Sequence, residues 1–327
     1  MLRRSPGGAP PGPRAPDPGS LERTAATPQN RDLLSLLDVT AEEFDALLDL
    51  AGHFKKGLGP VRPLEGRSVA LIFEKPSLRT HVTFDVAVAQ LGGHSIFLGP
   101  EQVGLGRRET PRDVARNLER WVDAIVCRTF QHATLEQLAC AASVPVVNAL
   151  SDDHHPCQAL ADTLTIKEVF GRTEGLTMAF IGDGNNVVSS LAEAALHARF
   201  KLVVASPPGY EFDGDRADRL RAWGADIRQV RRPAEAIEGA DIIYTDVWTS
   251  MGQEPERIKR LGDFKGYTVD AGMAGLLPPH GVVMHCLPAH YGEEVTEDVL
   301  HGPRSRAFDQ AENRLHVQKA LLTWLLS

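Results

Sequence analysis

The chain has 327 residues, of which 43% are hydrophobic and 24% charged, a composition that excludes an intrinsically disordered protein and at this length favours two domains. Its 35 basic and 43 acidic residues give a net charge of −8, which disfavours a whole-chain binding surface for nucleic acid or for an anionic membrane. No apolar run approaches the roughly 18 residues of a membrane span, and no apolar secretory signal follows residue 1, so we expect a cytoplasmic protein.

Residues 1–30 differ in composition from the rest of the chain. They contain seven prolines and four glycines among scattered arginines, and they have no apolar periodicity. We predict a disordered tail, because such a segment buries too little apolar surface to fold. An organellar transit peptide is the alternative, since the segment contains arginine and few acids. So many prolines disfavour the amphipathic helix that such peptides form.

Between residues 32 and 50, leucine and phenylalanine recur at helical spacing, which predicts two opening helices, and Thr40 with Glu43 forms the pattern of a capping box. Short β-branched runs then alternate with segments of helical period up to residue 170. The runs predict buried strands at Val69–Phe73, Ser95–Leu98, Ala124–Cys127 and Val144–Val147. The intervening segments predict helices at Thr83–Leu91, Val114–Trp121, Leu135–Ala142 and Ala159–Phe170. This alternation indicates a parallel α/β sheet.

The same alternation restarts after a turn-forming segment at Gly171–Gly175. The strands predicted there are Thr177–Ile181, Lys201–Ala205, Asp226–Val230, Asp241–Tyr244 and Val282–Met284. The last helical segment, Gln310–Leu326, follows the second sheet and is expected to cross back to the first domain. We therefore predict an α/β fold with two parallel-sheet domains, residues 31–168 and 169–309, and with the helix at 310–327 returned to the first domain.

In parallel α/β sheets, ligands bind at the carboxyl ends of the strands, so functional residues are expected in the loops after the predicted strands. The first such loop runs from Phe73 to Thr80, and Ser77 is positioned to cap the helix that follows. Helix N–H groups, the hydroxyls of Ser77 and Thr80 and the guanidinium of Arg79 together predict a phosphate site. The alternative is a capped helix with a solvated arginine.

Two further strand ends carry polar residues suited to a carbonyl compound. Arg128 ends a buried strand, where an unpaired charge is unfavourable, so we expect it to pair or to bind a ligand. His155 precedes a helix and can donate to a carbonyl oxygen, while Gln158, one turn on, can hold an amide. A metal site at His154 and His155 is the competing interpretation, which lacks a third ligand.

The second half opens with Gly182-Asp183-Gly184, the beginning of a dinucleotide-binding fingerprint. Val187 replaces the third glycine of that fingerprint, and Asp183 places a carboxylate where a pyrophosphate would bind. A nicotinamide cofactor is therefore disfavoured, which leaves Asn186 available to a smaller ligand. An NAD-dependent dehydrogenase is the alternative that this motif alone suggests.

Asp246 and Cys286 follow two later strands. Asp246 can accept from an ammonium group, and Cys286 either lies beside a nucleophile or packs in the core. The Leu287-Pro288 step invites a cis peptide, although X-Pro bonds are trans by default. The four cysteines include no C-x-x-C pair, so disulfides and a structural zinc site are disfavoured.

Five motifs follow one another between about residue 31 and the C-terminus: Lys75-Pro76-Ser77-Leu78-Arg79-Thr80, His155-Pro156-Cys157-Gln158, Asp246 with Ser250-Met251-Gly252, His285-Cys286-Leu287-Pro288, and Glu312-Asn313-Arg314. In order and spacing they resemble the ornithine carbamoyltransferases of the aspartate/ornithine carbamoyltransferase family. The resemblance implies transfer of the carbamoyl group of carbamoyl phosphate to the δ-amine of L-ornithine, which gives L-citrulline and phosphate in arginine biosynthesis or its catabolic reverse. It also implies a cleft between the two domains as the active site, a homotrimer with shared sites, and no metal or organic cofactor.

The resemblance implies roles for individual residues as well. The carbamoyl phosphate site would comprise Ser77, Leu78, Arg79, Thr80, Arg128, His155, Gln158, Cys286, Leu287 and Arg314. The ornithine site would comprise Asn186, Asp246, Ser250 and Met251. The catalytic residues would be Arg128, His155, Asp246 and Cys286. Arg128 and His155 are the donors expected to stabilise negative charge on the carbonyl oxygen, and either the departing phosphate or the neighbourhood of Cys286 and Asp246 would take the proton of the amine.

The sequence departs from the pattern of this family at three positions. His81 stands at a position where a second arginine is common in the family. Gly104 stands where many members carry a glutamine or histidine that reaches into a neighbouring subunit's site. Tyr291 stands where an arginine often follows the run from His285 to His290. Two alternatives stay open: a transcarbamoylase with another amine acceptor, and a catalytically weak binding or regulatory relative. Aspartate is disfavoured as the acceptor, because aspartate enzymes carry a threonine at the position of Cys157 and lack the Ser250-Met251-Gly252 loop.

Overall fold

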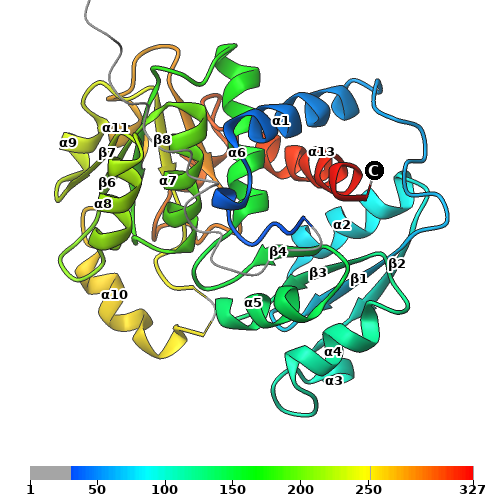
Figure 1. Ribbon diagram of the computed structural model, residues 1–327. Coiled ribbons are helices and arrows are strands. Elements are labelled where there is room, and N and C mark those ends of the chain that lie inside the picture. The colour runs from blue at the N-terminus through cyan, green and yellow to red at the C-terminus, as the bar shows by residue number, and fades with distance from the viewer. Residues whose placement is uncertain (1–30, 251, 327) are drawn as a thin grey trace, which may run out of the picture.

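The computed structural model describes residues 31–250 and 252–326, so the tail predicted at 1–30 lies outside the described residues. The described chain forms two parallel β-sheets with helices around them, which is the predicted α/β fold of two domains (Figure 1). The first sheet has the strand order β2-β1-β3-β4, and the second has the order β7-β6-β5-β8-β9.

The first sheet consists of β1 (Ser68–Phe73), β2 (His94–Leu98), β3 (Ala124–Arg128) and β4 (Val146–Leu150), all paired in parallel. β1, β3 and β4 are almost continuously buried, as expected of strands covered on both faces. The prediction of a buried strand at Ser95–Leu98 is wrong in its burial, since β2 is largely exposed. β2 pairs only with β1, at the edge of the sheet, and an apolar run alone does not distinguish an edge strand from a central one.

The second sheet consists of β5 (Thr177–Ile181), β6 (Lys201–Ala205), β7 (Ile227–Val230), β8 (Ile242–Thr245) and β9 (Val282–His285). Its register places Thr245 at the end of β8 opposite both Ile181 of β5 and His285 of β9. The residues that follow, Asp246 and Cys286, therefore leave the sheet side by side at its carboxyl edge.

The helices lie on both faces of each sheet. Those of the first half are η2 (Leu36–Asp38), α1 (Ala41–Lys55), α2 (Leu78–Gln90), α3 (Pro100–Val103), α4 (Pro111–Leu118), α5 (His132–Ala141) and α6 (Pro156–Phe170). Those of the second half are α7 (Asn186–Ala198), α8 (Gly214–Ala222), α9 (Pro233–Ile237), η3 (Glu254–Glu256), α10 (Arg257–Asp263), α11 (Ala271–Ala274), α12 (Glu297–Leu300) and α13 (Ala307–Leu326).

Several boundaries differ from the predicted ones. Thr40 and Glu43 do form the capping box of α1, but the first of the two opening helices is only the short 3-10 turn η2, because Val39 after it is extended. Helices α2, α4, α5, α6 and α13 begin about one turn before the predicted segments. For α4, α5 and α6 the reason is that the first turn begins with proline or histidine in place of apolar periodicity. β4 begins after Pro145 and continues to Leu150, through the buried Asn148.

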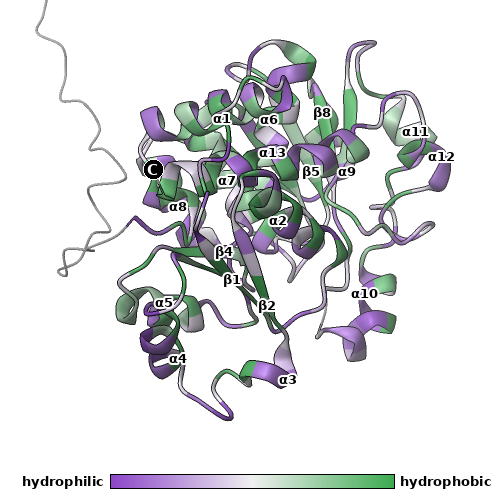
Figure 2. Ribbon diagram, turned by 90° about the vertical axis from the view of Figure 1, so that its right-hand side faces the viewer, coloured by the Kyte–Doolittle hydropathy of each residue, from purple (hydrophilic) through white to green (hydrophobic). Residues whose placement is uncertain are grey.

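One apolar core lies between the two sheets and is shared by both domains. Helices α1, α2, α6 and α13 meet there, and α13 contacts the first three, so the C-terminal helix crosses back to the first domain as predicted (Figure 1). Two smaller cores cover the outer faces of the sheets, one under α4 and α5 and the other under α9. Colouring by hydropathy shows the same arrangement, with apolar strands inside and polar helix faces outside (Figure 2).

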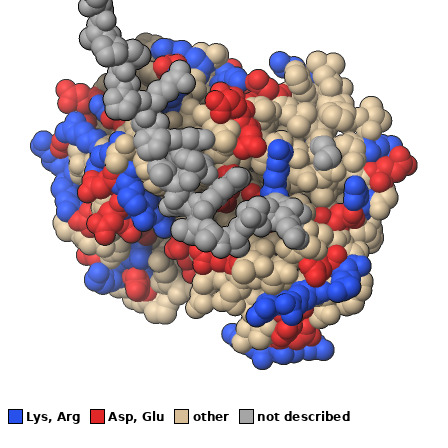
Figure 3. Space-filling model, viewed as in Figure 1, with Lys and Arg blue, Asp and Glu red and all other residues tan. Residues whose placement is uncertain are grey.

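Acidic and basic side chains alternate over the face of the molecule shown in Figure 3, and neither sign covers that face. Within the described residues, no helix combines the length and the apolar character that crossing a membrane requires.

Candidate active site

A pocket of about 1080 Å³ opens at the carboxyl ends of β1, β3, β8 and β9, between the two sheets. Its lining includes twelve residues expected from the sequence: Ser77, Leu78, Arg79, Thr80, Arg128, His155, Asn186, Asp246, Ser250, Cys286, Leu287 and Arg314. Gln158 lies behind the lining, and Met251 lies outside the described residues. Side chains that are far apart in sequence are thus brought together in one cleft between the domains.

The N-terminus of α2 faces one end of the pocket. Ser77 caps the helix, because its Oγ accepts from the N–H of Thr80 at 3.2 Å. The N–H groups of Leu78 and Arg79 in the first turn have no partner within the helix and are suited to an anion. Thr80 is buried, and its Oγ1 accepts from Arg314 at 2.6 Å. The residues predicted for a phosphate site are therefore brought together at this helix end.

Three guanidinium groups surround this helix end. Arg128 and Arg314 are 6% and 3% exposed, and Arg79 is partly exposed. Among the described residues, none of the three forms an ion pair with a carboxylate, and the Nε atoms of Arg128 and Arg314 have no hydrogen-bond partner. Burial first, and then repulsion by Arg314 and Arg79, lower the pKa of Arg128 to about 9. Such a cluster is electrostatically complementary to a small polyanion.

His155 is the residue before the first turn of α6, and it is 5% exposed. Its Nε2 lies 3.4 Å from Nη1 of Arg314, while its Nδ1 has no partner among the described residues. Burial, together with the positive charges of Arg314, Arg128 and Lys75, holds the pKa of His155 well below its ordinary value. The imidazole is therefore neutral at pH 7, and Nδ1 is the nitrogen left to donate.

Gln158 supports the pocket without lining it. Its Oε1 accepts from Nη1 of Arg314 at 2.8 Å, and its Nε2 donates to Asp162 at 2.8 Å. Gln158 thus lies one layer behind the pocket lining and acts on it by holding Arg314, which does face the pocket.

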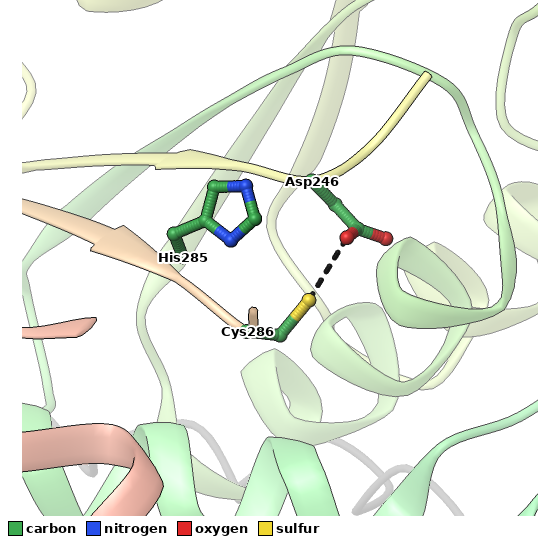
Figure 4. A group of neighbouring side chains, drawn as sticks. All are labelled: Asp246, His285 and Cys286. Carbon is green, nitrogen blue, oxygen red and sulfur yellow. Dashed lines mark hydrogen bonds between the residues drawn. The ribbon is translucent and has the colours of Figure 1, made fainter. Parts of the chain in front are cut away.

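Asp246 and Cys286 form the opposite side of the pocket, at the ends of β8 and β9 (Figure 4). Asp246 is 6% exposed, and its two oxygens accept from Sγ of Cys286 and from Nδ2 of Asn185, each at 2.9 Å. Burial and the neighbouring Asp246 raise the pKa of the Cys286 thiol well above its ordinary value. The thiol therefore remains protonated at pH 7 and acts as a donor, which disfavours Cys286 as a proton acceptor.

The ring of His285 lies beside this pair (Figure 4). Ligand atoms of His285, Cys286 and Asp246 lie within 4.8 Å of one another. Both ring nitrogens of His285 are engaged, since Nδ1 accepts from the N–H of Leu287 at 2.8 Å and Nε2 lies 3.2 Å from Glu294. The ring thus supports the turn after β9, where the Leu287-Pro288 peptide bond is cis.

The loop after β5 has a structural role in place of a dinucleotide site. Asp183 pairs with Arg260 at 2.7 Å, and a side chain at Gly184 would collide with the main chain of Phe212. Asn186 donates to the carbonyl of Ser151 at 2.6 Å and so links the two domains. These contacts explain the Gly182-Asp183-Gly184 sequence without a pyrophosphate.

Two residues that sequence reasoning missed take part in the site. Asn185 caps α7 and holds Asp246, and its position between a strand and a helix was the signal that could have found it. Lys75 is 4% exposed, forms an ion pair with Asp152, and lies 4.4 Å from the ring centre of Phe130. It adds another buried cation to the pocket, and it stands within a motif already singled out.

The three departures from the family pattern lie outside the pocket lining. The ring of His81 stacks on Phe97 of the edge strand, with 4.0 Å between the ring centres. Gly104 ends α3 in the left-handed conformation at φ +59°. The hydroxyl of Tyr291 lies 3.1 Å from Nε2 of His301.

Comparison with known proteins shows the family to which the chain belongs. Residues 31–168 match the model of the aspartate/ornithine carbamoyltransferase carbamoyl-P binding domain, and residues 174–325 match that of the Asp/Orn binding domain. The chain is 55% identical over 296 residues to an ornithine carbamoyltransferase of Thermus thermophilus, which covers 90% of this chain and 97% of the relative. A Bacillus subtilis ornithine carbamoyltransferase is 46% identical over 301 residues, which covers 90% and 94%.

Solved structures agree with the sequence comparison. The Pyrococcus furiosus ornithine carbamoyltransferase superposes with a TM-score of 0.87 at 46% identity, covering 92% of this chain and 99% of that one. The Thermus thermophilus crystal structure gives a TM-score of 0.84 at 52% identity, covering 91% and 99%. The chain belongs to the aspartate/ornithine carbamoyltransferase family.

Proposed function

We propose that this protein is an ornithine carbamoyltransferase, which transfers the carbamoyl group of carbamoyl phosphate to the δ-amine of L-ornithine and releases L-citrulline and phosphate. The observation that carries the proposal is the polarity of the pocket. One side holds the buried guanidiniums of Arg128 and Arg314, which lack carboxylate partners among the described residues, and the other side holds the buried carboxylate of Asp246. An anionic donor and an amino acid acceptor fit these two sides.

Carbamoyl phosphate binds at the N-terminus of α2. Its phosphate accepts from the first-turn N–H groups, from the Ser77 hydroxyl and from Arg79, while Arg128 bridges the phosphate and the carbonyl oxygen. His155 donates from Nδ1 to the same carbonyl oxygen, because Nε2 faces a guanidinium donor. Arg314, held by Gln158, and the turn at Cys286 and Leu287 complete the donor site.

Ornithine binds on the other side of the pocket, with its α-ammonium at Asp246 and its α-carboxylate near Asn186 and Ser250. The role of Met251 in this site stays a prediction, because Met251 lies outside the described residues. The neutral δ-amine attacks the carbamoyl carbon, and a C–N bond forms as the carbonyl oxygen takes up negative charge opposite Arg128 and His155. The C–O bond to phosphate then breaks. The departing phosphate takes the proton that the amine nitrogen loses, because the Cys286 thiol is already protonated.

The domain roles follow this division. Residues 31–168 with the helix at 310–327 bind carbamoyl phosphate, and residues 169–309 bind ornithine. Carbamoyl phosphate is an activated mixed anhydride, so the reaction needs no cofactor and no metal ion. All four cysteines are free thiols, which is consistent with a protein that functions in the reducing cytoplasm.

We further propose a homotrimer with shared sites. Apolar side chains are exposed next to the phosphate cradle, with Leu78 and Val82 of α2 at 74% and 48%, and Ile96 and Phe97 of β2 at 36% and 45%. An exposed edge strand and a neighbouring apolar helix face are suited to a contact with a second copy of the chain. Burial of this surface in a trimer would place the neighbouring subunit beside the carbamoyl phosphate end of the pocket.

A colorimetric citrulline assay tests the function. The purified chain receives carbamoyl phosphate with L-ornithine, acetylornithine, putrescine or aspartate in parallel. Product from ornithine alone supports the proposal, because putrescine lacks an α-carboxylate, and the acylated α-nitrogen of acetylornithine carries no positive charge to pair with Asp246. Product from another acceptor would assign a different transcarbamoylase, and no product from any of them would favour the binding relative.

A further inference from the structure

Asp162 of α6 is a fully buried carboxylate that lies outside the pocket lining. Its Oδ1 accepts from Nε2 of Gln158 and from Nε2 of Gln310, each at 2.8 Å. Its Oδ2 accepts from the hydroxyl of Tyr244 at 3.0 Å. Three polar side chains from α6, α13 and β8 thus converge on one carboxylate behind the site.

The carboxylate decides which way the Gln158 amide faces. Because an ionised carboxylate only accepts, the NH₂ group of Gln158 must turn toward Asp162, and its Oε1 must turn toward Arg314. With Gln158 reversed, two oxygens would face each other at Asp162, and the Arg314 guanidinium would lose its acceptor. Arg314 in turn donates to Thr80 at 2.6 Å, at the phosphate cradle.

Gln310 carries the same constraint to the other end of the pocket. Its NH₂ group faces Asp162, so its Oε1 is free to accept from the main-chain N–H of His285 at 2.9 Å. That N–H lies at the end of β9, directly before Cys286. Asp162 therefore sets the position of the β9 end relative to α6 through one glutamine on α13.

Packing does not account for a charge at this position. A carboxylate in a fully buried place is unfavourable unless donors surround it, and an apolar residue of similar volume is often as stable there. Burial raises the pKa of Asp162 to about 6, while the hydrogen bonds from Gln310, Gln158 and Tyr244 oppose that rise, so the group is ionised at pH 7. Its contacts are the ones that orient the residues around the site.

We propose that Asp162 is a positioning residue, which fixes the amide orientation of Gln158 and Gln310 and thereby aligns the Arg314 guanidinium with the end of β9. The inference rests on the proposed carbamoyl transfer. Asp162 touches neither substrate, and its effect on turnover passes through Arg314 and through the main chain before Cys286.

Two substitutions separate orientation from charge. In Asp162→Asn, the amide oxygen can accept from both glutamines and the amide nitrogen can donate to the Tyr244 hydroxyl, so orientation is kept while the charge is lost. We expect kcat within about fivefold of the parent. Asp162→Leu removes every acceptor, and we expect kcat to fall about 100-fold, since misplacement by about 1 Å has effects of that size.

The readouts distinguish positioning from a general structural role. Inorganic phosphate, titrated by calorimetry, binds the α2 end of the site, where Arg314 donates to Thr80. Its affinity should therefore fall about tenfold in Asp162→Leu and change less than about threefold in Asp162→Asn. Thr163→Val is the matched control, because within the described part of the chain the buried Thr163 hydroxyl donates only to the carbonyl of Ala159 in its own helix, at 2.8 Å. It should keep kcat within about twofold.

Specific results would overturn the inference. If kcat of Asp162→Leu equals that of Thr163→Val, Asp162 does not position the site. If kcat of Asp162→Asn is as low as that of Asp162→Leu, the charge of Asp162 is what matters, and the orientation of the glutamine amides is not. If Asp162→Leu does not fold, Gln310→Met tests the link to β9, with kcat about tenfold lower expected and an unchanged kcat overturning the proposal. Absence of citrulline from the parent and from Thr163→Val would instead refute the proposed function.

Discussion

Substitution of Arg128 by methionine should remove most of the activity and stabilise the fold. Arg128 is 6% exposed, and the hydrogen bond from its Nη1 to Oγ1 of Thr80 is long, at 3.5 Å. Its pKa falls from 12.5 to about 9, first because of burial and then because of Arg314 and Arg79. The folded protein thus holds this positive charge in surroundings that disfavour it.

The magnitude follows from the linkage between protonation and folding. Each unit of pKa difference between the folded and unfolded chain corresponds to about 1.4 kcal/mol, so the charged Arg128 lowers the free energy of unfolding by roughly 3–5 kcal/mol at pH 7. The folded pKa is the lower one, so this unfavourable contribution is complete at pH 7 and declines only as the pH rises above about 9. Methionine removes the charge and keeps much of the packing, so the free energy of unfolding should rise by about 1–3 kcal/mol.

Thermal unfolding in phosphate-free buffer should therefore show a Tm about 2–8 °C higher for Arg128→Met. Citrulline formation should fall about 1000-fold, because loss of one donor to a developing oxyanion lowers kcat by about 10²–10³ and a phosphate contact is lost as well. Arg112→Met, at an exposed arginine of α4, is the matched control and should change neither quantity. A lower Tm, or near-normal turnover, in Arg128→Met would refute this reasoning.

Three further outcomes are expected. Asp246→Ala should raise the KM for ornithine about 100-fold in initial-rate assays and change the KM for carbamoyl phosphate less than about threefold. An equal rise in both KM values would contradict the division of the pocket into two substrate sides. Cys286→Ser keeps a donor to Asp246 and should retain kcat within about tenfold, whereas a much larger loss would assign a role to the thiolate. Since burial lowers the pKa of His155, kcat/KM for carbamoyl phosphate should show no protonation step near pH 6.5, and an acidic limb centred there would disprove a neutral imidazole.

The strand ends were predictable because polar residues after buried apolar runs are a strong local signal. Ser77, Arg128, Asp246 and Cys286 each follow such a run, and each lines the pocket. Parallel sheets bring those ends to one edge, so the topology converts four separate signals into one site.

The second layer was not predictable in the same way. Asp162 sits within a helix of apolar periodicity, and two of its three partners, Tyr244 and Gln310, come from strand and helix positions far along the chain. The exposure of β2 was missed for a related reason, since pairing on one side only is a property of the assembled sheet. Likewise, Gln158 supports the pocket from behind, because Arg314 of α13 lies between it and the cleft.

The return of α13 to the first domain also determines when the protein can acquire activity during synthesis. Domains usually fold in order as the chain leaves the ribosome. Here the core between the sheets is completed by Val317, Leu321 and Leu322, and the anion site by Arg314, all of them in α13 and after both sheets in sequence. The first domain therefore cannot complete its core until α13 has been synthesised, and chains interrupted before α13 are left with an open core and no working site.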